Sequence, residues 1–178
     1  MAIQIGAKPD SGFDDPIGML KDCHRRIERF LDILCKVVKQ ARGRELDTEE
    51  RRAVEAALAY FRESGPRHNL DEEESLFPRL LCRQVPAVSD DVHRLEAEHR
   101  ETKALHEEAD RLYSKWVAER GLATDDENQL LSITEQLQGI YGGHIHLEED
   151  VIFPCAAHAL GQSDLTAIGA EFKTRRGL

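Results

Sequence analysis

Two stretches of the chain carry an imidazole and a carboxylate at the same spacing. His68 is followed four residues later by Glu72, and His144 is followed four residues later by Glu148. Each pair opens a frame of eleven residues, H-x-x-x-E-E-[ED]-x-[LI]-F-P, and the second frame begins 76 residues after the first. Residues four apart project from the same face of an α-helix. One such pair arises by chance in helices, but two copies of the whole frame indicate a functional site.

Two further histidines extend the repeat. His24 precedes His99 by 75 residues, so each half of the chain supplies one isolated histidine and then one HxxxE pair. The chain therefore resembles an internal duplication. An ionised carboxylate is costly to bury without a partner, and two of them among imidazoles are best explained by metal cations. We predict a metal centre formed by His24, His68, Glu72, His99, His144 and Glu148.

The number of ligands favours two metals. If both glutamates bridge, each metal receives two imidazoles and two carboxylate oxygens, and a bridging oxide or hydroxide adds a fifth ligand. A nitrogen and oxygen set without sulfur, with one position open, suits iron best and manganese next. Zinc prefers four ligands and is a weaker fit. The predicted cofactor is therefore a pair of iron ions, oxo- or hydroxo-bridged.

Helical periodicity predicts the elements that hold these residues. Apolar residues and the candidate ligands recur every three or four positions in four stretches, which are 20–38, 54–76, 92–116 and 130–152. Helix starts are expected at Pro16, Thr48, Ser89 and Thr124, the last within a capping box that ends at Glu127.

Helix-breaking residues occur within these stretches and after one of them. Gly65-Pro66 and Gly142-Gly143 stand just before the motif histidines, and we predict a kink at each pair that re-aims the following turn. Pro86 is expected in the turn that follows the first motif. The predicted fold is all-α, an antiparallel up-down-up-down four-helix bundle with a short extra C-terminal helix. Residues 1–15 would form an irregular lead-in, 16–160 the bundle, and 161–178 the short helix and tail.

Composition narrows the classes of partner. The chain has 178 residues and a net charge of −10, which disfavours nucleic acid and anionic membrane surfaces. No apolar run is long enough to span a bilayer, and we expect no signal peptide. The four cysteines form no CxxC pair, which favours free thiols in the cytoplasm.

The order H…HxxxE…H…HxxxE with paired EE…FP tails resembles the hemerythrin-like (HHE cation-binding) family of non-haem di-iron four-helix bundles. The resemblance covers roughly residues 16–158. It implies that the six residues of the predicted metal centre are the iron ligands, with Glu72 and Glu148 as the bridging carboxylates. Leu95 and Lys103 flank His99 four residues away, where oxygen-carrying hemerythrins have another ligand histidine. The chain is therefore similar to the symmetric six-ligand branch of the family.

Other polar residues near the motifs have more than one interpretation. His106 could be a ligand, a hydrogen-bond partner or a core residue, and Tyr141 could bond near an open site or belong to the core. The acidic residues that follow the motif glutamates are expected to be solvated, although one could orient a ligand histidine. They are Glu73, Glu74, Glu149 and Asp150.

Three functions fit this centre. The first is a protein that binds, senses or reacts with oxygen, nitric oxide or peroxide. The second is a di-iron oxidase or peroxidase, and the third is a redox-inert interaction or iron-buffering module stabilised by metal. No residue is assigned a catalytic role, and the sequence does not indicate a redox partner.

Overall fold

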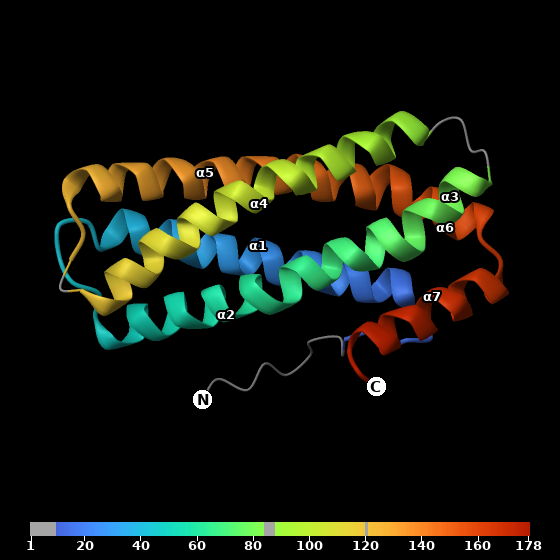
Figure 1. Ribbon diagram of the computed structural model, residues 1–178, viewed down its shortest axis with the longest axis horizontal. Helices are drawn as coiled ribbons and strands as arrows, with labels where there is room; N and C mark the ends of the chain where they lie inside the picture. Colours follow the sequence, from blue (N-terminus) through green and yellow to red (C-terminus); the bar gives the residue numbers. More distant parts are fainter. Residues whose placement is uncertain (1–9, 84–87, 120) are drawn as a thin grey trace.

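Four long helices lie side by side in alternating directions in the computed structural model (Figure 1). The structure describes residues 10–83, 88–119 and 121–178, and no strand occurs among them. The four helices are α1 (Pro16–Gln40), α2 (Thr48–Asp71), α4 (Ser89–Ala118) and α5 (Thr124–Leu147). α1 packs against α2 and α5, and α4 packs against the same two helices. The predicted up-down-up-down bundle is confirmed.

Shorter segments extend two of these helices. η1 (Glu72–Leu76) and α3 (Phe77–Cys82) continue α2, while η2 (Glu148–Ile152) and α6 (Phe153–Ala159) continue α5. The last helix, α7 (Gln162–Arg175), returns beside this end of the bundle (Figure 1). The predicted C-terminal helix is therefore present. Residues 1–9 of the predicted lead-in, and Pro86 of the predicted turn, lie outside the described residues.

The two motifs share an unusual backbone geometry. η1 and η2 are π-helical turns, and each begins on a motif glutamate. The Phe77 amide donates to the carbonyl of Glu72, and the Phe153 amide donates to the carbonyl of Glu148, in both cases five residues back. The next residue is proline in both copies, and proline has no N–H to donate. The F-P ending of the motif thus suits the return from a π-turn to an α-helix.

The position of this irregularity differs from the sequence prediction. The predicted kinks lie at Gly65-Pro66 and Gly142-Gly143, but α-helix continues through both pairs. The departure from α-helical geometry comes after each motif histidine instead of before it. A π-turn inserts one extra residue into the helix, and this lets the following residues face a different direction.

One predicted cap is also wrong. Thr124 makes no capping hydrogen bond, and Ala123 precedes the first turn of α5 without a side-chain cap. Glu127, predicted to complete a capping box, is buried and accepts a hydrogen bond from the amide of Gly43 at 2.7 Å. Its carboxylate therefore ties the start of α5 to the loop that connects α1 and α2.

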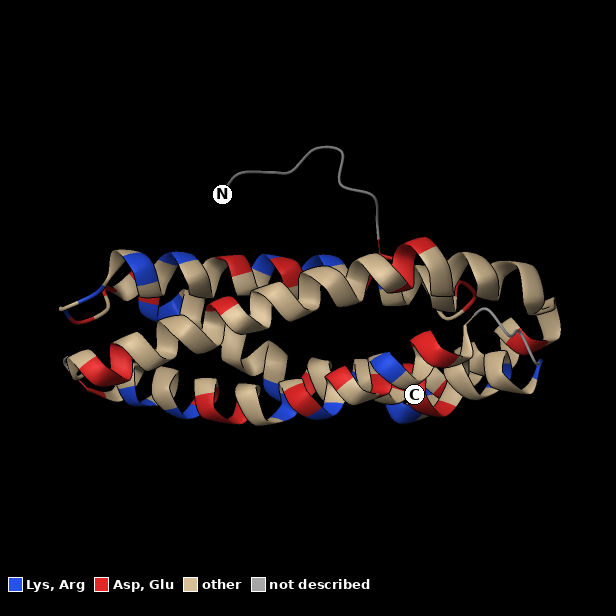
Figure 2. Cartoon of the chain, turned by 90° about the horizontal axis from the view of Figure 1, so that it is seen from above, with Lys and Arg blue, Asp and Glu red and all other residues tan. Residues whose placement is uncertain are grey.

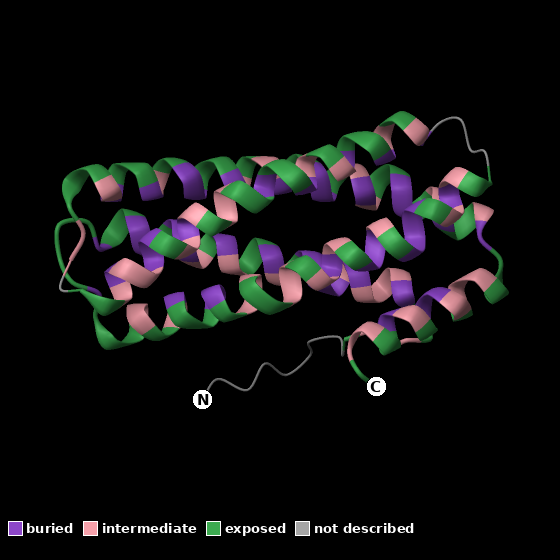
Figure 3. Cartoon of the chain, viewed as in Figure 1, coloured by how far each residue is buried: buried purple, intermediate pink, exposed green. Residues whose placement is uncertain are grey.

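Apolar residues form two clusters, one on each side of the predicted metal centre. Along α1, Leu20 belongs to one cluster and Ile27 to the other, with His24 between them. Along α4, Leu95 and Ala109 belong to different clusters, and His99 lies between them in sequence. Buried residues recur on the inward side of each long helix (Figure 3). The polar centre is therefore enclosed in an otherwise apolar interior.

Charged residues of both signs are interspersed along the long helices (Figure 2). No helix in the described part of the chain has the length and apolar character that a membrane span requires.

α7 is anchored to the end of α2 by a buried ion pair. Asp71 is 1% exposed, and its carboxylate accepts from Arg175 at 2.8 Å and from Arg176 at 2.7 Å. Arg175 also donates to the hydroxyl of Ser75 in η1 at 2.6 Å. Because Asp71 directly precedes Glu72, these contacts fix the backbone from which a candidate ligand projects.

Replacing both Arg175 and Arg176 with alanine leaves Asp71 as a buried carboxylate without a cation. We expect the free energy of unfolding to fall by about 3 kcal/mol, since the loss of the partners of a buried charge has that order of cost. Urea unfolding under fixed metal conditions measures the difference. Arg111→Ala, which removes only a surface pair with Glu108, should change stability by less than about 0.5 kcal/mol. Equal effects of the double variant and the control would contradict this anchoring role.

Candidate metal centre

Six side chains from the four long helices and their π-helical continuations meet in the interior of the bundle. They are His24 of α1, His68 of α2, Glu72 of η1, His99 of α4, His144 of α5 and Glu148 of η2. Each is at most 5% exposed. The structure thus brings together all six residues that the sequence singled out, and their role as metal ligands remains a prediction.

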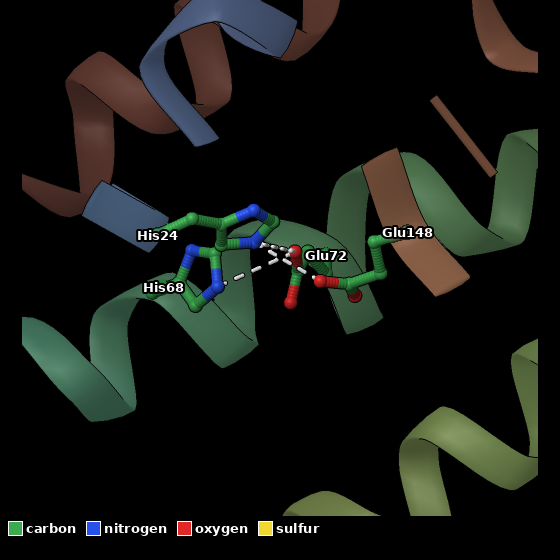
Figure 4. Close-up of side chains that lie close together, drawn as sticks. All are labelled: His24, His68, Glu72 and Glu148. Carbon is green, nitrogen blue, oxygen red and sulfur yellow. Dashed lines mark ion pairs between the residues drawn. The ribbon is translucent and has the colours of Figure 1, made fainter. Parts of the chain in front are cut away.

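The six residues form two overlapping groups. One pairs His24 and His68, the other pairs His99 and His144, and both groups contain Glu72 and Glu148. Within each group, one potential ligand atom per residue lies within 4.8 Å of every other. Figure 4 shows the first group, with both carboxylates directed toward the two imidazoles. Two overlapping groups that share two carboxylates are the arrangement expected for a dinuclear site.

The Glu72 carboxylate offers one oxygen to each histidine pair. Its Oε1 lies 3.5 Å from Nε2 of His68 and 4.0 Å from Nε2 of His24. Its Oε2 lies 3.5 Å from Nε2 of His99. Such an orientation is what a bridging carboxylate needs.

The Glu148 carboxylate is oriented in the same way. Its Oε2 lies 3.0 Å from Nε2 of His24, and its Oε1 lies 3.3 Å from Nε2 of His144. The imidazoles of the second pair are themselves close, with 3.1 Å between Nε2 of His99 and Nε2 of His144. All four histidines therefore direct Nε2 toward the shared carboxylates.

Carboxylates on the outer side hold two of the imidazoles in this orientation. Nδ1 of His24 lies 2.9 Å from Glu149, and Nδ1 of His99 lies 2.7 Å from Glu73. Glu149 and Glu73 are the residues that follow the two motif glutamates, so each motif orients a histidine from the other half of the chain. A carboxylate on Nδ1–H leaves Nε2 unprotonated and free to bind a metal. The sequence allowed this role for one flanking acid, and the structure shows it for two.

The other two candidate ligand histidines, His144 and His68, differ in what their Nδ1 atoms contact. Nδ1 of His144 lies 2.9 Å from Glu98, which sequence reasoning missed although it directly precedes His99. Nδ1 of His68 is buried and has no hydrogen-bond partner among the residues that the structure describes. The position equivalent to Glu98 in the first half of the chain is occupied by Cys23. The duplicated centre is therefore asymmetric outside its six candidate ligands.

Burial and nearby charges shift the pKa values of the two shared carboxylates in opposite directions. Burial, together with the nearby charge of Glu148, raises the pKa of Glu72 well above its usual value. Burial also opposes ionisation of Glu148, but the close imidazoles of His144 and His24 outweigh it and lower the pKa of Glu148. One negative charge is thus stabilised by the protein alone, whereas ionisation of both carboxylates requires additional positive charge.

Unpaired polar atoms show that cations would fit this space. Both carboxylate oxygens of Glu72 and of Glu148 are buried without a partner in hydrogen-bonding geometry among the described residues, and so is Nε2 of His24. Buried polar groups of this kind are normally satisfied by a hydrogen bond or an ion. Imidazole nitrogens and carboxylate oxygens without sulfur suit iron or manganese.

His106 and Tyr141 lie next to the centre without belonging to either group. Nε2 of His106 is 3.0 Å from the hydroxyl of Tyr141, and the rings of Tyr141 and His144 are 6.2 Å apart between centroids. Burial lowers the pKa of His106 to about 4 and raises that of Tyr141. His106 and Tyr141 thus bond to each other, Tyr141 also belongs to the larger apolar cluster of the core, and His106 is absent from both ligand groups.

Comparison with known proteins agrees with this geometry. Residues 15–156 match the family described as Hemerythrin HHE cation binding domain. An uncharacterised protein of Haemophilus influenzae is 29% identical over 164 residues, which cover 92% of this chain and 91% of that protein.

Removing an outer carboxylate should weaken metal binding without removing a candidate ligand. We expect Glu73→Gln and Glu149→Gln each to lower the affinity for metal by about 10- to 100-fold, the usual effect of losing the partner of a ligand histidine. Competition with a chromophoric chelator measures this affinity. Asp150→Asn is the matched control, because Asp150 is exposed and its ion pair among the described residues is with the exposed His146. Affinities of both glutamine variants equal to the control would refute the orienting role.

His106 should make folding sensitive to acid. Its folded pKa of about 4 lies below the unfolded value of about 6.5, so the unfolded chain takes up a proton that the folded chain does not. Stability therefore falls as the pH drops from about 7 to 5, and we expect this loss to be about 1–2 kcal/mol larger in the wild type than in His106→Gln. Urea unfolding of both proteins under the same metal conditions provides the test. Parallel stability curves across this pH range would contradict the account.

Proposed function

Because the chain belongs to the hemerythrin HHE cation-binding domain family, we propose that it holds two iron ions and uses them to bind, sense or react with a small oxidant or diatomic molecule. The candidate molecules are oxygen, nitric oxide and peroxide. The observation that carries the proposal is the pair of overlapping groups that share both Glu72 and Glu148. Two iron ions held in these groups would lie side by side and could together supply the two electrons that reduce a small oxidant.

The donor set supports iron over zinc. Each group offers two imidazole nitrogens and two carboxylate oxygens, so each ion would receive four protein ligands. Iron accommodates more than four ligands, and this leaves coordination positions for an exogenous molecule. Zinc in structural sites is complete with four. When bound, two iron ions would supply a redox-active pair that exchanges electrons with a small oxidant.

The protein residues supply orientation and isolation from water. Glu73, Glu98 and Glu149 fix three of the four imidazoles through Nδ1. The two apolar clusters on either side of the centre exclude bulk solvent and lower the local dielectric constant. These apolar surroundings favour small uncharged molecules over hydrated ions.

An oxidase or peroxidase is the second candidate, and the His106–Tyr141 pair favours it. The pair lies beside the centre, and its imidazole is neutral at neutral pH because burial lowers the pKa of His106 to about 4. A neutral imidazole bonded to a phenol can accept or relay a proton. Steady turnover of peroxide with a reductant would distinguish this enzyme from a protein that only binds or senses.

Iron loading followed by exposure to oxygen tests the proposal. We expect the protein loaded anaerobically with ferrous iron to hold two ions per chain, one for each group of candidate ligands. Exposure to oxygen should then produce a new absorption band near the boundary of the ultraviolet and visible ranges. Glu72→Ala should lower the iron content and abolish the band, whereas Glu74→Ala, a change at an exposed carboxylate, should do neither.

Two controls make this result decisive. Zinc-loaded protein should show no band, because zinc has no redox chemistry. Protein that holds two iron ions but shows no spectral change with oxygen, nitric oxide or peroxide would overturn the proposed function.

A further inference from the structure

A cavity of about 550 Å³ lies inside the bundle beside the candidate metal centre, and residues of α1, α2, α4 and α5 line it. Its wall includes His99, and it also includes the bonded pair His106 and Tyr141. Exposed Arg100 and Lys103 line it as well, so the cavity opens to solvent between α2 and α4. It therefore connects the surface with the edge of the site.

The size of this cavity exceeds what a diatomic molecule needs. A water-sized molecule occupies about 30 Å³ of liquid volume. Sites for organic ligands and cofactors have volumes of about 300–1,000 Å³. The cavity falls within that second range, so its volume indicates an occupant larger than oxygen, nitric oxide or peroxide.

The walls are mainly apolar. α2 contributes Leu58, Phe61 and Gly65, and α4 contributes Ala109. Gly65 widens the cavity, because a Cβ atom at this position would meet only the ring of Phe61, at 3.9 Å. The Gly65-Pro66 pair, predicted from the sequence to be a kink, thus lines a cavity in a helix that continues through it.

The His106–Tyr141 pair determines which hydrogen-bonding group the occupant must carry. If the Tyr141 hydroxyl donates to Nε2 of His106, its oxygen remains free to accept a hydrogen bond; if Nε2–H donates instead, the hydroxyl proton remains free. A hydroxyl on the occupant can both donate and accept, so it complements either tautomer. The charged residues that line the cavity balance in sign and give no reason for the occupant to carry charge; they are Arg62, Arg100 and Lys103 against Glu73, Glu107 and Asp110.

We propose that this cavity binds a neutral apolar alcohol or phenol, with its hydroxyl on the His106–Tyr141 pair and its hydrocarbon body against Leu58, Phe61 and Ala109. The occupant lies beside the metal centre and is distinct from the small molecule that the centre itself would bind. Binding of this kind requires the cavity and no redox chemistry, so it is independent of which metal the centre holds.

The test is titration of zinc-loaded protein with 2-naphthol, followed by calorimetry or by the fluorescence of the naphthol. We expect saturable binding of one molecule per chain. Gly65→Leu and Ala109→Leu fill the cavity from opposite walls. Each should weaken binding at least about 10-fold, because the added side chain occupies space that the naphthol needs. Gly139→Leu is the matched control, because Gly139 is an exposed helical glycine with no atom near its Cβ position and does not line the cavity.

A second comparison tests the hydroxyl contact. Tyr141→Phe should weaken 2-naphthol binding about 5- to 10-fold, the value of one hydrogen bond, and should leave naphthalene binding unchanged. Circular dichroism and zinc content of each variant confirm that it is folded and loaded.

Three results would overturn the proposal. The first is the absence of saturable 2-naphthol binding, and the second is binding that both cavity-filling variants leave intact. The third is tighter binding of naphthalene-2-sulfonate than of 2-naphthol, which would assign the cavity to an anion held by Arg100 and Lys103 instead. None of these results bears on iron binding or on the reaction with oxygen, so each is distinguishable from a failure of the proposed function.

Discussion

Burial of two carboxylates at one point is the constraint on which the rest of this bundle depends. Glu72 and Glu148 are fully enclosed, and their oxygens face four imidazoles that are themselves buried. Removing an ion from water costs on the order of several kcal/mol. The nearby imidazoles lower the pKa of Glu148, whereas burial and the Glu148 charge keep the pKa of Glu72 raised. Two metal cations would satisfy every unpaired carboxylate oxygen in this space at once. The fold is therefore best understood as a frame that keeps these two side chains in place.

Several local features of the chain serve that purpose. The π-turns let Glu72 face the interior while the next residue, Glu73, reaches across to orient His99. A proline stands in the first turn of the α-helix that follows each π-turn, and α7 fixes the backbone before Glu72 through Asp71. The duplication makes most of these features occur twice. It is incomplete at Cys23, where the other half has the carboxylate that orients its motif histidine.

Sequence periodicity predicted the helices and the residues that meet inside them, because helical spacing alone decides which side chains share a face. The same spacing assigns His24 and His99 to the centre. The backbone irregularities were predicted at the wrong positions, because a π-turn depends on the packing of the segment more than on glycine or proline. Glu98 was missed because its role depends on how α4 meets α5. The cavity depends on the separation of α2 and α4, which no local pattern specifies.

A crystal structure of iron-loaded protein, with anomalous scattering recorded at the iron edge, would test the dinuclear centre most directly. We expect two peaks about 3.5–4 Å apart, the usual separation in two-metal sites. One peak should adjoin His24 and His68, the other should adjoin His99 and His144, and Glu72 and Glu148 should lie between them. A single peak, or two peaks without either glutamate between them, would contradict the claim that the buried carboxylates bridge two metals.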